Sequence, residues 1–246
     1  MRFSKISSYS MLILALSIGV TLPSFGMIEE TTETQTTNLK AKPLPETHPD
    51  FSALRGFIKS PATPTEFDAK VYGKLNTLFK DAARSPTKED FDVVWMAQRA
   101  GVDVKNRFEL PFYKQVAEWM KFTPLENPMT QEHFNAASKT EALFNGAARF
   151  PTKEDFDVVW MAQQAGVDVE DRFQLLFYKR VAEWMKFIPL ANPMNQKHFK
   201  AANKTRALFK GTPGPSTAND FLKVYDALQK GVEIKNRLDL DNYKIQ

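Results

Sequence analysis

This sequence offers little material for enzyme or metal chemistry based on cysteine or histidine. The chain has no cysteine and 3 histidines, which excludes disulfides, thiolate nucleophiles and zinc–thiolate sites. His133 and His198 occupy matching positions in two related segments, but they are preceded by different residues, Glu132 and Lys197. A metal site would need further ligands close by in both segments. We therefore interpret the two histidines as solvated or locally hydrogen-bonded.

Clustered charges offer two further candidates for chemistry. Glu89, Asp90 and Asp92 could form an acidic pair, but they lie where a helix begins, and carboxylates there are stabilised by the helix dipole. Three arginines recur at a fixed spacing and predict a repeated salt link or a ligand clamp, of which we favour the salt link. They are Arg107, Arg172 and Arg237.

Sequence motifs of common enzyme classes do not occur in the chain. There is no nucleophile elbow, P-loop, dinucleotide-binding glycine motif or H-E-x-x-H zinc motif. We therefore predict no catalytic, cofactor-binding or metal-binding residues, no cofactor and no enzymatic activity. An unrecognised hydrolase is the enzyme alternative, and it would lose turnover when one buried carboxylate is changed.

A repeat of 65 residues organises the elements that must position these side chains. Residues 86–104 and 151–169 are identical except for Arg99 and Gln164. A third copy has diverged, with Tyr225 where the first two copies have tryptophan, and it stops early. We predict three units, which we call copy one (57–121), copy two (122–186) and a truncated copy three (187–246).

Each copy has the hydrophobic spacing and the boundary signals of three helices. In copy two the first helix is expected over about Thr130–Phe144. The second begins at Thr87 in copy one, with Asp90 completing a capping box and Gly101 ending the helix; the box recurs as Thr152/Asp155 and Thr217/Asp220. The third is expected over about Asp103–Met120, either kinked or split at Pro111 in copy one. The predicted fold is all-α, with tandem three-helix units stacked into an elongated array.

Aromatic residues at repeat spacing are the expected core of these units. They lie on stripes with other apolar residues, so packing is favoured over the alternative of an exposed set of binding anchors. The expected core residues are Phe91, Trp95, Phe108, Tyr113, Trp119, Phe156, Trp160, Phe173, Tyr178, Trp184, Tyr225 and Tyr243.

The N-terminal part of the chain has the composition of a targeting segment. Residues 1–26 combine Arg2 and Lys5, an apolar run over 11–22 and small residues near Gly26, which predicts a secretory signal peptide. Residues 27–56 are expected to form a flexible leader, because they hold few apolar anchors. Cleavage would lower the formal charge from +4 to +2. We expect no nucleic-acid binding and no membrane span after cleavage.

This layout resembles that of the RxLR effectors secreted by oomycete plant pathogens. Those proteins carry a signal peptide, a leader with an R-x-L-R translocation motif, and tandem helical WY modules. Ser52, Ala53, Leu54 and Arg55 match the last two fixed positions of the motif, with serine in place of its first arginine. Trp-led segments resemble the module motif: Trp95, Ala100, Gly101, Val104, Phe108, Leu110 and Tyr113, and then Trp160, Phe173 and Tyr178.

The resemblance implies a destination and a mode of action. It implies secretion, delivery into the cytoplasm or nucleus of a plant cell, and suppression of immunity by binding host proteins without catalysis. It also implies that the tryptophan and tyrosine lie inside each module. The alternative class is a secreted or periplasmic bacterial repeat protein with a scaffolding or adhesive role.

Overall fold

The protein is all-helical over the residues that its structure, a computed structural model, describes. These are residues 42–58, 62–189, 191–212 and 214–245, and they contain ten helices and no strand. The predicted all-α class is thereby confirmed. The helices are α1 (Phe51–Leu54), α2 (Glu66–Phe79), α3 (Lys88–Arg99), α4 (Leu110–Met120), α5 (Gln131–Leu143), α6 (Lys153–Gln164), α7 (Arg172–Met185), α8 (Gln196–Phe209), α9 (Ala218–Gln229) and α10 (Arg237–Asn242).

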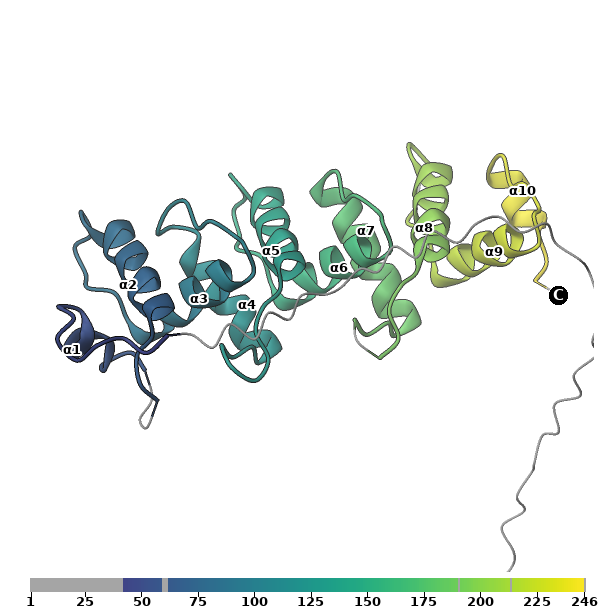
Figure 1. Cartoon of the computed structure of the whole chain (residues 1–246). Coiled ribbons are helices and arrows are strands. Elements are labelled where there is room, and N and C mark those ends of the chain that lie inside the picture. Colours follow the sequence, from purple (N-terminus) through teal and green to yellow (C-terminus); the bar gives the residue numbers. More distant parts are fainter. Residues whose placement is uncertain (1–41, 59–61, 190, 213, 246) are drawn as a thin grey trace, which may run out of the picture. The chain divides into compact units, whose positions relative to one another are not determined.

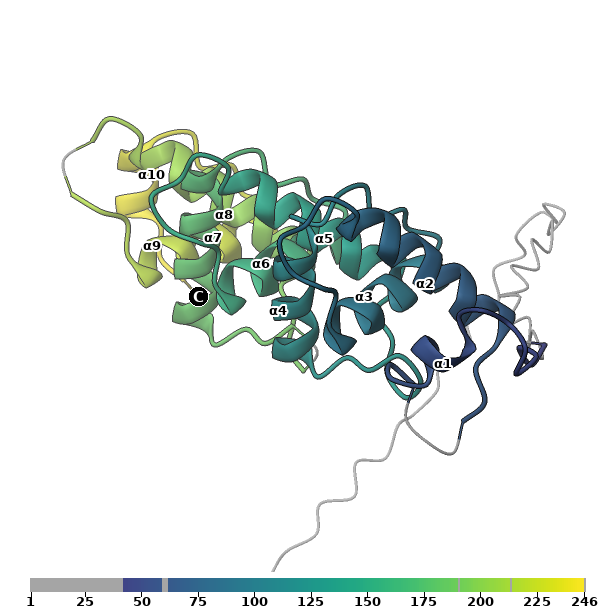
Figure 2. The ribbon, with the colours of Figure 1, turned by 90° about the vertical axis from the view of Figure 1, so that its left-hand side faces the viewer.

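The helices belong to one compact unit, Ala41–Gln246, and pack in chain order. Each helix contacts the next one along the chain, and α4 and α7 also contact the helices two places ahead, α6 and α9. Figures 1 and 2 show this succession from α1 to α9 in two directions of view. Most tertiary contacts are therefore made between neighbours in the sequence.

Side-chain caps fix where several helices begin. Thr87 Oγ1 accepts the backbone N–H of Asp90 at 3.3 Å, and the Asp90 carboxylate accepts the N–H of Thr87 at 2.8 Å. The same box starts α6 and α9, so the three predicted capping boxes are confirmed. Gly101, with a φ of 73°, adopts the left-handed conformation after α3, as predicted.

The third helix of copy one is shorter than predicted. It was expected over Asp103–Met120 but spans Leu110–Met120. Pro111 lies in its first turn, where the missing N–H has no intrahelical partner to lose, so the proline starts the helix and does not kink it. In copy two Leu176 replaces this proline, and α7 begins earlier in its copy, at Arg172.

The core contains many of the expected aromatic residues. Phe91, Tyr113, Phe156, Trp160 and Tyr178 are buried. Five others are partly buried and pack against the core, namely Trp95, Trp119, Trp184, Tyr225 and Tyr243.

Two of the expected core residues lie at the surface. Phe108 is 72% exposed and Phe173 is 77% exposed, so the prediction that they are core residues is wrong. Phe108 precedes α4 and lies under the Arg107 guanidinium, whose carbon is 5.0 Å from the ring centroid. Phe173 lies in the first turn of α7, and it is off the buried stripe to which Leu175 and Tyr178 belong.

The boundary of the expected flexible leader also differs from the structure. Residues 42–56 belong to the folded unit, because Leu44 and Leu54 are buried and α1 packs against α2. The backbone N–H of Leu44 donates to the carbonyl of Pro64 at 2.8 Å, which pins this segment to the start of α2. Two buried leucines ten residues apart, Leu44 and Leu54, anchor residues 42–56 to the folded unit. The expected signal peptide and residues 27–41 lie outside the described residues.

Candidate functional site

The motif that resembles a translocation signal is built into a helix. Ser52, Ala53 and Arg55 are exposed, but Leu54 is fully buried at the end of α1. The Arg55 guanidinium carbon lies 5.4 Å above the Phe51 ring. The structure therefore presents three of the four candidate residues to solvent and uses the fourth as a core anchor.

His133 and His198 lie between aromatic rings and cap helices. His133 Nδ1 accepts the backbone N–H of Thr130 at 3.0 Å at the start of α5. Its ring lies 4.5 Å from that of Phe122 and stacks on Trp160 with centroids 4.2 Å apart. Burial lowers the pKa of His133, although Glu132 opposes this effect. The expected local hydrogen bonding is confirmed, with aromatic stacking in addition.

The same arrangement recurs one copy later, and a different one occurs one copy earlier. His198 Nδ1 accepts the N–H of Asn195 at 3.0 Å, and its ring stacks on Tyr225 at 4.6 Å. Burial lowers the pKa of His198 as well. In copy one the position belongs to Asp68, which instead accepts the indole N–H of Trp95 at 2.9 Å. The position thus joins the first helix of each copy to the second.

A buried carboxylate forms a hub at the start of the second helix in copies one and two. Asp155 accepts hydrogen bonds from Arg149 at 2.7 Å and Lys179 at 2.8 Å, and from the N–H of Thr152 at 2.8 Å. Burial alone would raise its pKa, but these donors outweigh burial and lower the pKa to about 2. The carboxylate is held ionised and fully engaged, which suits it for structure and not for proton transfer.

Asp90 forms the equivalent hub in copy one. It is bound by Arg84 at 2.7 Å and by Lys114 at 3.3 Å. Burial opposes its ionisation, while the bonds from Arg84 and the N–H of Thr87 lower its pKa to about 2. Asp92 lies on the side of α3 in an ion pair with Lys88. Asp90 therefore caps its helix, as predicted, and Asp92 forms an ion pair that was not predicted.

The recurring arginines do not form one repeated contact. Arg107 lies over Phe108, whereas the Arg237 guanidinium carbon is 4.7 Å from the centroid of the Phe209 ring. Asp171, which precedes Arg172, and Asn236, which precedes Arg237, cap α7 and α10. The ring contacts of Arg107 and Arg237 therefore differ from one another, and the salt link and the ligand clamp stay predictions.

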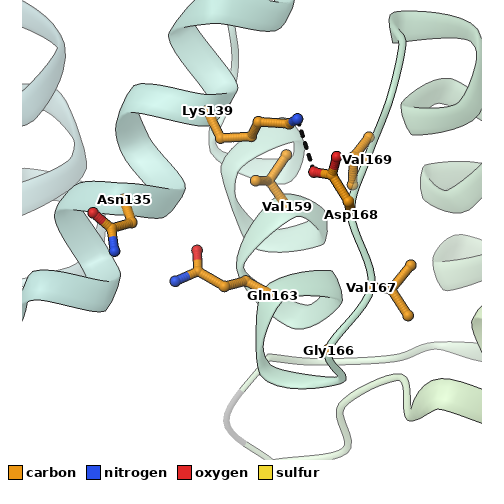
Figure 3. Close-up of a pocket in the computed structure, with 8 residues that line it drawn as sticks. All are labelled: Asn135, Lys139, Val159, Gln163, Gly166, Val167, Asp168 and Val169. Atoms are coloured by element: carbon orange, nitrogen blue, oxygen red, sulfur yellow. Dashed lines mark ion pairs between the residues drawn. The ribbon is translucent and has the colours of Figure 1, made fainter.

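Side chains of α5, α6 and the segment after α6 line a hollow in copy two. We call it groove two; it lies between α5 and the segment that follows α6, and it has a volume of about 390 Å³. Figure 3 shows Lys139 reaching from α5 to Asp168, with 2.8 Å between nitrogen and oxygen, while Asn135 and Gln163 lie on facing helices. Its lining residues are Asn135, Lys139, Val159, Gln163, Gly166, Val167, Asp168 and Val169.

Copy three has a groove at the same place, which we call groove three. Its volume is about 260 Å³, and seven of its lining positions match those of groove two one copy earlier. The buried floor is more apolar and the rim holds two lysines. Its lining residues are Lys200, Lys204, Val224, Ala227, Leu228, Val232, Glu233 and Ile234.

Neither groove was predicted from the sequence. Each is formed by side chains from two elements that lie about thirty residues apart, and hydrophobic periodicity within one helix does not reveal such a pairing. One signal was present: where copies two and three differ, Asn135 corresponds to Lys200 and Gln163 to Leu228. Copy one has Lys70 and Gln98 at these positions, so both positions vary among the three copies.

Other features of the described residues bear on function. No helix among them is long and apolar enough to cross a membrane. In the same part of the chain, no group of three or more histidine, aspartate or glutamate side chains is placed to hold a metal ion. Comparisons with family models, curated proteins and solved structures found no match to this chain.

Proposed function

We propose that this protein is a secreted, effector-like, non-catalytic protein that binds host proteins through the surface of its helical copies and thereby suppresses plant immunity. The observation that carries the proposal is the recurrence of one groove in copies two and three with a retained apolar floor and a changed rim. Repeated helical units commonly serve as binding surfaces, because a shared framework presents different side chains from each unit.

The proposal includes an architecture and a destination. Residues 1–26 act as a signal peptide that is removed on secretion, and the leader is confined to residues 27–41. The three copies, 57–121, 122–186 and 187–246, stack as three-helix units into an elongated array, and the ordered segment around α1 covers its first unit. The equivalent hubs around Asp90 and Asp155 support this repeat, because the same three-way contact recurs one copy apart.

The absence of catalysis is part of the same proposal. Asp90 and Asp155 are the two fully buried carboxylates among the described residues, and each is saturated by cationic and backbone donors. A general acid or base needs a pKa near the working pH and an oxygen within reach of substrate. A carboxyl with a pKa of about 2 does not meet the first condition.

Affinity capture with matched variants tests the proposal. The tagged secreted chain serves as bait in leaf extract, beside a variant that carries Gln163→Asp and Leu228→Asp in the two grooves. We expect plant proteins that the parent retains and the variant loses, while the variant keeps the parent's helical circular dichroism. Partners retained equally by both chains would contradict binding through the grooves. Background alone in extracts from several plants would contradict the effector role and favour a scaffolding protein.

A further inference from the structure

Groove three differs from groove two in charge far more than in shape. Residues 122–186 carry 7 basic and 10 acidic residues, a net charge of −3, whereas residues 187–246 carry 10 and 5, a net charge of +5. Residues 57–121 of copy one carry 11 basic and 9 acidic residues, a net charge of +2, so copy three is the most basic of the three copies. Much of the change lies along its first helix.

The helix α8 presents a line of lysines beside the groove. Lys197, Lys200 and Lys204 are three and four residues apart, so they share one face of the helix. The range Gln196–Phe209 contains no acidic residue. Lys197 donates to the Gln229 side chain at 2.9 Å, and none of the three lysines has an ion-pair partner within the described part of the chain. Their charge is therefore uncompensated.

In copy two the equivalent positions are acidic, neutral or occupied by an ion-paired lysine. Glu132 and Asn135 stand where copy three has Lys197 and Lys200. Lys139 is paired with Asp168, whereas Glu233, the equivalent of Asp168, lies 3.8 Å from Lys235. The one carboxylate on the rim of groove three thus leaves Lys204 unpaired.

The floor of groove three gives the lysines an apolar neighbour. Val224, Ala227 and Ile234 are buried beneath it, and Leu228 and Val232 remain 42% and 44% exposed at its edge. Leu228 replaces the amide of Gln163, so the groove loses a polar group as the rim gains charge. Its volume of about 260 Å³ lies below the range of roughly 300–1,000 Å³ usual for small-molecule sites. A groove of this size suits single side chains of a peptide.

We propose that groove three is a docking site for an acidic peptide segment of a partner protein. The peptide inserts an aliphatic or aromatic side chain between α8 and the segment after α9. Its carboxylates lie against Lys197, Lys200 and Lys204. Charge complementarity selects the acidic segment, and burial of Leu228 and Val232 provides the apolar part of the affinity. This inference rests on the proposed protein-binding function and names the partner's chemistry at one site.

The chain supplies its own control variants, because each groove shows which residues the other tolerates. Lys200→Asn, Leu228→Gln and Glu233→Asp together give groove three the rim of groove two. The opposite set, Glu132→Lys, Asn135→Lys, Gln163→Leu, Asp168→Glu and Glu170→Lys, gives groove two the charges and apolar edge of groove three. Both variants introduce only residues already present at the matching position of the other copy, and circular dichroism checks their folding.

The test is a selection from a random peptide library displayed on phage, with the full-length chain as bait. We expect enriched peptides in which Asp or Glu flank Leu, Ile or Phe. For the most enriched peptide, measured by fluorescence anisotropy, the first variant should raise Kd about tenfold or more, because it removes charge and apolar contact together. The second variant should raise the stoichiometry from one peptide to two in calorimetry.

Several outcomes would overturn the inference. They are failure to enrich any peptide, enrichment of peptides without acidic residues, or a Kd that the first variant leaves unchanged. An affinity that falls with Lys200→Asn but is unaffected by Leu228→Gln would show binding of any polyanion, nucleic acid included, without use of the groove. If a plant protein captured by the parent is also retained by the first variant, the proposed function stands and this inference fails.

Discussion

Copies two and three hold the start of their second helix in different ways. Asp155 is fully buried and is bound by Arg149 and Lys179, whereas Asp220 is partly exposed and is hydrogen-bonded to Thr217. Gly214 stands in copy three where copy two has Arg149, so no guanidinium is available there. The groove lysines differ in the same direction. Lys139 of copy two is paired with Asp168, whereas Lys200 and Lys204 of copy three have no ion-pair partner among the described residues. At these two sites, copy two uses its charges to hold elements together, whereas the groove lysines of copy three lack ion-pair partners among the described residues.

Truncating the stacked aromatic of each copy should give the largest difference. Trp160 is 7% exposed and packs on His133, so Trp160→Ala should lower the free energy of unfolding by about 3–5 kcal/mol. Tyr225→Ala, at a partly buried position, should cost only about 1–2 kcal/mol. Urea titration followed by circular dichroism measures both, and equal losses would show that the two copies are packed alike.

Neutralising the capping aspartate should give the next largest effect. Asp155→Asn removes a charged acceptor from two cations and should cost about 2–3 kcal/mol. Asp220→Asn, the matched control, loses chiefly the charge of a helix cap and should cost about 0.5–1 kcal/mol. Thermal melts at pH 7 would separate them, and a loss at Asp220 as large as that at Asp155 would contradict the difference between the copies.

Acidification should weaken both histidine-containing copies by a smaller amount. Burial lowers the pKa of His133 and of His198 from 6.5, so their contribution is fully present above pH 6.5 and is lost as the pH falls through the folded pKa. Protonation of Nδ1 removes the cap acceptor, worth about 1 kcal/mol at each helix. His133→Asp with His198→Asp, which introduces the residue of copy one, should flatten the dependence of the melting temperature between pH 7 and pH 5. If the double variant kept the same dependence of melting temperature on pH, other titratable groups would be its cause.

The exposed phenylalanines should matter least for folding. Phe173→Ser should change the free energy of unfolding by no more than about 0.5 kcal/mol, because the side chain lies at the surface. Differential scanning calorimetry against Phe156→Ser, a fully buried position, provides the contrast. A large loss of unfolding free energy in Phe173→Ser would show that Phe173 is a core residue.

The boundaries of α3 could be predicted from the sequence, whereas the exposure of Phe108 could not. Thr87 and Asp90, and Gly101 fourteen residues after Thr87, predicted where α3 begins and ends, because caps and left-handed glycines act through local backbone geometry. Phe108 could not be placed in this way. Its burial depends on where α4 begins and on which face of that helix meets its neighbours, and both are set by tertiary packing.

The candidate site was harder to predict from the sequence than the fold. The near-identity of residues 86–104 and 151–169 predicted the repeat, but a groove forms only when α5 and the segment after α6 are brought together. Leu54 shows the same limit: a motif read as part of a flexible leader turned out to anchor a helix. Local signals predicted elements, and the contacts between distant elements required the structure.

The unequal hubs have a consequence for how the molecule responds to mechanical load. Arg149, Asp155 and Lys179 join the loop before α6, the start of α6 and α7 at one point, whereas the matching point of copy three lacks the arginine. A chain pulled from its two ends, as during threading through a narrow pore, should yield first at the weakest link, so α8 to α10 should open before the copies that precede them. Optical-tweezer traces would show this as a first extension step that Asp220→Asn barely alters and that Asp155→Asn causes to merge with the second.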